Sequence, residues 1–120
     1  MSASPGTAMA STASKKFIYD YSRPALTVDA ILVSEEREPK VLLIQRRNDP
    51  YGGEWALPGG FVDEMEPLDK AAARELQEET SVDPAGIELV QTGTYGDPGR
   101  DPRGKRRLRR TRAVCLRGTL

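Results

Sequence analysis

The chain of 120 residues is long enough for one domain with one modest hydrophobic core and too short for two. Its formal net charge is zero, no apolar run reaches the length of a membrane helix, and the 38% hydrophobic content is typical of a soluble globular protein without a membrane partner. A single cysteine, Cys115, excludes an internal disulfide, and the absence of histidine excludes a Cys/His zinc site, so any metal must be bound by oxygen atoms.

The N-terminal segment MSASPGTAMASTASKK is built from small and polar residues and has too few large apolar groups to form a core. We therefore expect residues 1–16 to be a disordered tail. The segment lacks the apolar stretch of a secretory signal. It is acid-free and serine-rich, as organelle transit peptides are, but it contains no arginine and is very short. A cytoplasmic location is expected, with organelle targeting left open.

Two short apolar runs follow, ALTVDAILV at residues 25–33 and KVLLIQR at residues 40–46, on either side of a charged loop. Their β-branched and apolar composition predicts two paired strands. The next segment, RNDPYGGEWALPGG at residues 47–60, is rich in Asn, Asp, Pro and Gly and predicts an irregular surface loop that carries functional residues.

Trp55 in this loop has two interpretations. A packing anchor is favoured over a ligand-stacking ring, because most tryptophans are largely buried. The second role is kept as an alternative in the set of candidate substrate-binding residues, which are Arg46, Trp55 and Gly60.

A helix is predicted from about Pro67 to Thr80, because the fixed φ of proline suits the first helical position and LDKAAARELQEET follows. Residues 87–94 predict a further strand, which ends before the turn-rich GDPGRDPRG. The order strand, strand, helix, strand without an internal repeat predicts an α+β or mixed α/β/α domain.

The predicted helix gathers carboxylates on one face. Glu75, Glu78 and Glu79 are spaced i, i+3 and i+4, so the three like charges share one arc and repel one another. A divalent cation would relieve the repulsion, and carboxylates beside the carbonyl of a glycine turn suit Mg²⁺ or Mn²⁺. Acidic clusters are more often solvated helix faces, so the spacing alone is weak evidence.

The wider pattern is far more specific. Gly60, five residues, Glu66, seven residues and then RELQEETSV from Arg74 to Val82 resemble the Nudix box. One position departs from the family pattern, because Ser81 stands where the family has glycine, so the turn after the helix must form without the residue that adopts positive φ most readily.

The resemblance implies an α/β class fold, a Nudix-type α/β/α sandwich with a mixed sheet. It also implies Mg²⁺-dependent hydrolysis of a nucleoside diphosphate linked to another moiety, with Mn²⁺ as the other candidate cofactor. By the same resemblance Arg74 orients the site through a salt bridge with Glu66, although an i,i+4 surface pair with Glu78 remains open. The implied metal ligands are Glu75, Glu78, Glu79 and the backbone carbonyl of Gly60 or Gly59.

The substrate prediction depends on Pro98, sixteen residues after Val82. A proline-containing segment at this place is similar to that of the ADP-ribose pyrophosphatase branch, which implies hydrolysis of ADP-ribose to AMP and ribose 5-phosphate. A plain turn-rich loop is the alternative. The alternative function is a non-catalytic module that binds an ADP-ribose-like ligand. A homodimer is left open.

After Gly104 a Nudix protein would continue with alternating apolar strands and a final helix, whereas this chain continues with KRRLRRTRAVCLRGTL. Such an arginine-rich segment is not expected to supply the buried face of a strand. We therefore interpret residues 17–104 as a partial Nudix domain, incomplete at its C-terminal side and truncated or frame-shifted after Gly104, and residues 105–120 as a basic tail outside the family fold.

Two expectations follow from that interpretation. Hydrolysis by the chain as written should be weak or absent, although the acidic motif should still bind Mg²⁺. The tail could bind an anionic partner, but a solvated or disordered tail is favoured over a nucleic-acid arm, because no aromatic residue is interleaved for base stacking.

Overall fold

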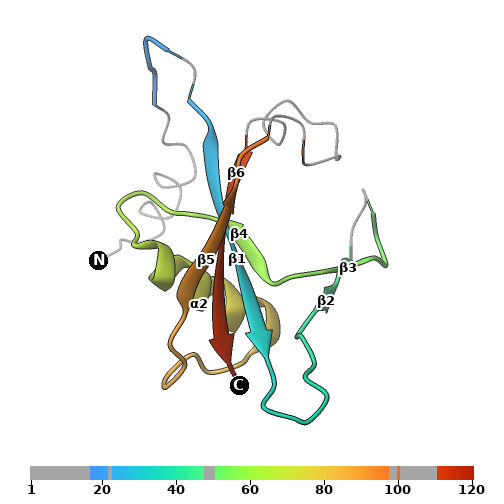
Figure 1. Cartoon of the computed structure of the whole chain (residues 1–120). Helices are drawn as coiled ribbons and strands as arrows, with labels where there is room; N and C mark the ends of the chain where they lie inside the picture. The colour runs from blue at the N-terminus through green and yellow to red at the C-terminus, as the bar shows by residue number, and fades with distance from the viewer. Residues whose placement is uncertain (1–16, 22, 48–50, 98–99, 101–110) are drawn as a thin grey trace, which may run out of the picture.

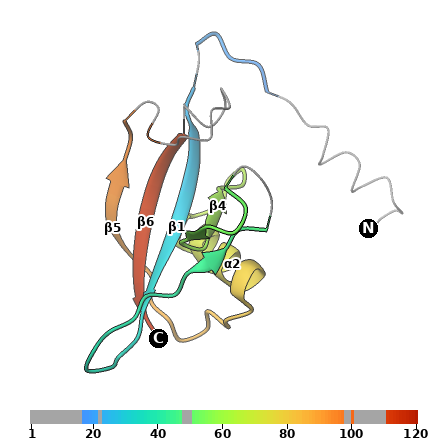
Figure 2. The same ribbon diagram turned by 90° about the vertical axis from the view of Figure 1, so that its right-hand side faces the viewer.

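The computed structural model describes residues 17–21, 23–47, 51–97, 100 and 111–120. Four strands form a mixed sheet in the order β4-β1-β6-β5, and β2 and β3 form a separate two-stranded ribbon (Figure 1). One helix packs against one face of the sheet (Figure 2). The elements are β1 (Ala25–Val33), β2 (Ile44–Gln45), β3 (Trp55–Ala56), β4 (Gly59–Phe61), α2 (Leu68–Thr80), β5 (Val90–Tyr95) and β6 (Thr111–Thr119).

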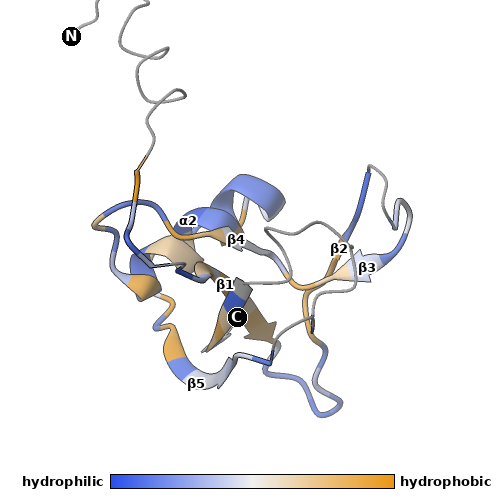
Figure 3. Cartoon of the chain, turned by 90° about the horizontal axis from the view of Figure 1, so that it is seen from above, coloured by the Kyte–Doolittle hydropathy of each residue, from blue (hydrophilic) through white to orange (hydrophobic). Residues whose placement is uncertain are grey.

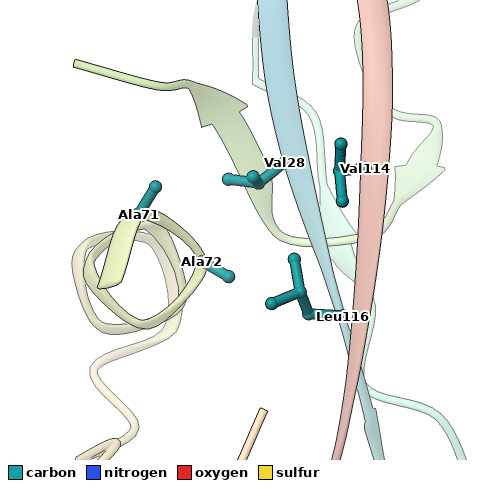
Figure 4. Close-up of a cluster of buried hydrophobic side chains, with 5 residues drawn as sticks. All are labelled: Val28, Ala71, Ala72, Val114 and Leu116. Carbon is teal, nitrogen blue, oxygen red and sulfur yellow. The ribbon is translucent and has the colours of Figure 1, made fainter. Parts of the chain in front are cut away.

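The core lies between α2 and the sheet, because alternate residues of β1 point toward the helix and are buried. The small side chains that α2 presents let it approach the strands closely. One cluster is drawn in Figure 4 and consists of Val28, Ala71, Ala72, Val114 and Leu116. A second cluster joins the end of β1 to the end of α2 and consists of Ala30, Leu32 and Leu76. Full burial of such leucines contributes about 1.5–3 kcal/mol each.

The strand β6 corrects the interpretation of residues 105–120 as a tail outside the fold, which is wrong for residues 111–119. This strand pairs in parallel with all of β1 and antiparallel with β5, so it is a central strand of the described sheet. Its apolar run is buried at Ala113, Val114, Cys115 and Leu116. A strand covered on both faces needs a continuous apolar run instead of alternation, and AVCL is such a run although arginines flank it.

The other predicted elements agree in part. The first strand and the helix are confirmed at Ala25–Val33 and Leu68–Thr80. The predicted pairing of residues 40–46 with β1 is limited to a single bridge between Val33 and Val41, and β2 pairs with β3 instead. Residues 47–60 are less irregular than expected, since they contain β3 and the start of β4. The last predicted strand begins later than residue 87, at Val90.

The α/β class with a mixed sheet is confirmed, and the described residues contain one helical layer of the expected sandwich. Seen from above, the β2–β3 ribbon lies to the side of the sheet and α2 (Figure 3). In the described part of the chain no helix is long and apolar enough to cross a membrane. The predictions for residues 1–16, for Pro98 and for residues 105–110 fall outside the described residues.

Candidate active site

The loop between β4 and α2 is closed by Glu66. The backbone N–H of Asp63 donates to Glu66 Oε1 at 3.0 Å, and the backbone N–H of Glu66 donates to the Asp63 carbonyl at 3.2 Å. Met65 inside this turn has a positive φ of 63°. The extended backbone of Pro67 then leads into α2. The carboxylate of Glu66 is therefore fixed at the start of the helix, where the helix dipole favours negative charge.

Arg74 links this loop to the helix. Its Nε donates to Glu66 Oε2 at 2.8 Å and its Nη2 donates to Glu66 Oε1 at 2.9 Å, which is the predicted salt bridge in bidentate form. Nη2 also donates to the Phe61 carbonyl at 3.1 Å, while Nη1 donates to Glu75 at 2.7 Å and to Glu78 at 3.3 Å. Arg74 thus makes both the salt bridge with Glu66 and the i,i+4 contact with Glu78.

These contacts set the protonation of the pair. Hydrogen bonds from Arg74, and secondarily from the backbone of Asp63, lower the pKa of Glu66 to about 2, against a small opposing effect of burial. The same interactions raise the pKa of Arg74. Both groups are charged at every physiological pH. Their ion pair therefore links the loop after β4 to α2 throughout this range.

The two glycines of β4 create space for carboxylates. A Cβ on Gly60 would lie 2.6 Å from the carboxylate carbon of Glu75, closer than real Cβ atoms approach any neighbour. The backbone N–H of Gly59 donates to Glu79 Oε2 at 3.3 Å, and a Cβ on Gly59 would collide with the side chain of Asp29 on β1. Glycine at both positions allows the carboxylates of α2 and β1 to crowd against the β4 backbone.

The crowding changes the acidity of Glu79. Burial raises the pKa of Glu79, and the nearby carboxylates of Glu75 and Asp29 raise it further, while the N–H of Gly59 opposes the shift. Carboxylates from α2 and β1 therefore repel one another, and a bound divalent cation would relieve this repulsion. The donor set fits such an ion in chemistry. Within the described residues, no three acidic, Cys or His side chains already converge as a metal site.

Glu78 shares the Nη1 donor of Arg74 with Glu75 but is the more exposed of the two. Its carboxylate is drawn to Arg74 and its side chain is 57% exposed. Glu78 and Glu79 both line a pocket of about 630 Å³ whose lining also includes Arg46 and Arg47. The structure thus brings Glu75 and Glu79 together beside the glycines, and Arg74 contacts both Glu75 and Glu78.

A second pocket, of about 370 Å³, is lined by the predicted substrate-binding residues. Arg46, Trp55 and Gly60 line it together with Glu79. Trp55 is 64% exposed, so the favoured interpretation of this residue as a packing anchor is wrong. The lining residues that sequence reasoning missed include Asp29, Tyr51 and Arg100. Of these only Asp29 carried a signal, as a charged residue in the middle of the apolar strand ALTVDAILV.

The departure from the Nudix pattern at Ser81 has a structural consequence. Ser81 ends α2 with a φ of 63° and a ψ of 10°, and its backbone N–H donates to the Gln77 carbonyl. This left-handed conformation is the one that glycine adopts most readily after a helix. The turn therefore forms as the pattern requires, with a residue that pays a steric penalty for it.

Comparison with known proteins agrees with this geometry. An ADP-ribose pyrophosphatase from Methanocaldococcus jannaschii is 46% identical over 84 residues, which cover 70% of this chain and 47% of the relative. The ADPR responsive transcriptional repressor NtrR of Acinetobacter baylyi is 44% identical over 88 residues, which cover 71% of this chain and 34% of the relative. The chain thus spans about half the length of the first relative and a third of the second.

A solved structure and a family match complete the comparison. The NUDIX domain of Shewanella oneidensis NrtR complexed with ADP ribose superimposes with a TM-score of 0.69 and 38% identity, covering 92% of this chain and 70% of that chain. Residues 23–118 match the sequence model of the NUDIX domain, a span that contains the acidic motif and most of β6. The chain therefore belongs to the NUDIX domain family.

Proposed function

We propose that this domain hydrolyses ADP-ribose to AMP and ribose 5-phosphate. The observation that carries the proposal is the 370 Å³ pocket. It is lined by Glu79 and the two β4 glycines together with arginines and exposed aromatic residues. Such a pocket offers donors for a diphosphate and apolar surface for a nucleoside. The similarity to a protein named ADP-ribose pyrophosphatase, and to a domain solved with ADP ribose, supports this substrate.

The cofactor in this proposal is Mg²⁺, with Mn²⁺ as its substitute. Glu75, Glu78, Glu79 and the Gly60 carbonyl would hold it. A divalent cation supplies charge neutralisation on the pyrophosphate and lowers the pKa of water. Oxygen-only ligands are the donors that these ions prefer.

The remaining roles belong to the protein's own groups. Arg46 and Arg100 line the pocket, and guanidinium groups bind diphosphate oxygens through paired N–H donors. Burial and the neighbouring carboxylates raise the pKa of Glu79, and a bound cation would favour the charged form of this carboxylate. Arg74 does not line this pocket and acts by positioning Glu66 and Glu75.

The expectation of weak or absent hydrolysis depended on residues after Gly104 lying outside the fold. Because β6 is a central strand, that reason no longer applies to residues 111–119, and we propose that hydrolysis occurs. The test is AMP release from ADP-ribose by the purified chain with and without Mg²⁺. Release that depends on Mg²⁺ and is lost in Glu79→Gln supports the proposal, whereas equal rates for Glu79→Gln and the wild type contradict it. Glu38→Gln, in an exposed loop, controls for the loss of one negative charge.

A second candidate is a non-catalytic module that binds ADP-ribose and regulates a partner. The similarity to a repressor described as ADPR responsive favours it. Comparison of turnover with affinity separates the two, because an enzyme loses turnover in Glu79→Gln. A binding module shows no turnover in either form and retains measurable ADP-ribose affinity by calorimetry.

A further inference from the structure

Tyr51 has an unusual backbone conformation. Its φ is 64°, in the left-handed region that bulky L-residues seldom adopt because Cβ approaches the backbone too closely. Gly53, two residues later, also has a positive φ, of 87°, but glycine has no Cβ and adopts this conformation without a steric cost. The turn therefore holds Tyr51 in a conformation that carries a steric cost.

Several hydrogen bonds hold this turn against β2. The backbone N–H of Gly53 donates to the Arg46 carbonyl at 2.7 Å, and the backbone N–H of Arg46 donates to the Glu54 carbonyl at 2.8 Å. The side-chain amide of Gln45 donates to the Gly53 carbonyl at 2.8 Å. Strain that is fixed by so many surrounding contacts is typical of functional sites, where it places a side chain in a required position.

The side chain that is placed in this way lines the 370 Å³ pocket together with Trp55. Tyr51 is 39% exposed and Trp55 is 64% exposed, so neither ring is covered by the described core. Trp55 begins β3, which pairs with β2, and Tyr51 lies in the turn just before it. This ribbon lies to the side of α2 (Figure 3). Two accessible aromatic residues that line one pocket offer surfaces for a planar ring, since every nucleobase has a face that can stack.

We propose that Tyr51 and Trp55 form the nucleobase subsite of this pocket. The base packs on these rings, and the diphosphate lies toward Gly59 and Glu79. Trp55 precedes Gly59 by four residues, so the two are separated by at most roughly 13 Å of extended chain at about 3.3 Å per residue. One nucleotide can therefore contact both Trp55 and Gly59. The inference rests on the proposed function for the identity of the ligand, a nucleoside diphosphate, but its test requires no hydrolysis.

The sequence allows a direct test, because Trp55 is the single tryptophan of the chain. Intrinsic tryptophan fluorescence therefore reports on this position alone. We would titrate the protein with AMP and, separately, with ribose 5-phosphate, and correct for absorption with free tryptophan amide. The inference predicts a saturable change with AMP and none with ribose 5-phosphate. A saturable change with neither ligand, or an equal one with both, would overturn it.

Variants of Tyr51 separate binding from folding. Tyr51→Gly relieves the backbone strain, so its melting temperature should not fall, while its AMP affinity should drop about fivefold or more with the loss of one stacking ring. Tyr51→Phe keeps the ring and should retain AMP affinity within about twofold. Tyr95→Ala removes an exposed tyrosine outside this pocket and should leave the affinity unchanged. Unchanged affinity in Tyr51→Gly would refute the subsite.

Failure of the subsite and failure of the proposed function give different results. If ADP-ribose is hydrolysed but AMP leaves Trp55 fluorescence and the Tyr51 variants unaffected, the subsite is wrong and the hydrolase stands. If AMP changes the fluorescence and Tyr51→Gly weakens binding while no AMP is released from ADP-ribose, the subsite stands and the hydrolase is wrong.

Discussion

Arg74 and Glu66 form a bidentate ion pair, with the two donor–acceptor distances at 2.8 Å and 2.9 Å. The pair connects the turn after β4 to the middle of α2, so the loop and the helix that present the carboxylates are fixed relative to each other. The side chains of both partners are partly buried, at 27% and 16% exposed. A buried charge that loses its partner is costly, which makes this pair the clearest stability determinant of the site.

Glu66→Gln should destabilise the fold. The substitution removes the charge that Arg74 faces and weakens both hydrogen bonds, so the free energy of unfolding should fall by roughly 1–3 kcal/mol at neutral pH. Urea unfolding followed by circular dichroism measures the change, with exposed Glu38→Gln as the matched control. Equal stability of the two variants would show that the pair contributes nothing.

The same substitution should alter the acid response. The pKa of Glu66 is lowered from 4.5 to about 2 in the folded protein, so its contribution is complete above pH 4.5 and is lost as the pH falls toward 2. The wild type should lose stability through this interval, and Glu66→Gln should lose less. Parallel curves of stability against pH for the two proteins would contradict the assignment.

Ser81→Gly should stabilise the protein. Ser81 holds the left-handed conformation with a φ of 63°, and glycine removes its steric cost, so the gain should be about 1 kcal/mol. Ser81→Ala keeps the Cβ and should give no gain. Thermal unfolding compares the three proteins, and a lower melting temperature for the glycine variant would show that the serine side chain itself is needed.

Gly60→Ala should damage the site more than the fold. The added Cβ would meet the Glu75 carboxylate, so this group must move and Mn²⁺ affinity should fall on the order of tenfold. Manganese titration by electron paramagnetic resonance measures the affinity. Gly86→Ala is the control, because its φ of 82° makes alanine costly there while nothing lies within 4 Å of the new atom. Equal Mn²⁺ affinity for both variants would argue against Glu75 as a ligand.

Leu116→Ala tests whether β6 belongs to the domain. Leu116 is 2% exposed in the cluster with Val28 and the α2 alanines, so truncation should cost about 2–5 kcal/mol. Leu120→Ala, at a position 62% exposed, should change stability by less than about 0.5 kcal/mol. Denaturant unfolding of both variants checks this. Indistinguishable midpoints would mean that residues 111–119 do not pack as a central strand.

The sequence predicted those parts of the molecule that depend on local pattern. The β-branched and apolar composition of residues 25–33, and the proline and helix-forming residues of 67–80, were sufficient, because each signal arises from neighbours along the chain. The spacing between Glu66 and Arg74 predicted their ion pair through the Nudix resemblance. The strand β6 was missed because a short apolar run between arginines reads as a tail until two partner strands are known to flank it.

The pocket could be predicted only in part for a similar reason. Trp55 was assigned to the core because tryptophans are usually buried, and only the ribbon formed with β2 leaves it exposed. Tyr51 and Asp29 reach the same pocket from a turn and from β1, an arrangement set by tertiary contacts with no counterpart in residue spacing. Local rules thus located the carboxylates, while the nucleoside end of the pocket required the fold.

The central claim is tested most directly by measuring AMP and ribose 5-phosphate release from ADP-ribose by the purified chain. We predict equimolar release of the two products in the presence of Mg²⁺, its loss on chelation, and a drop of at least about 100-fold in Glu79→Gln. A well-folded chain that binds Mn²⁺ yet releases no AMP at any Mg²⁺ concentration would contradict the hydrolase assignment.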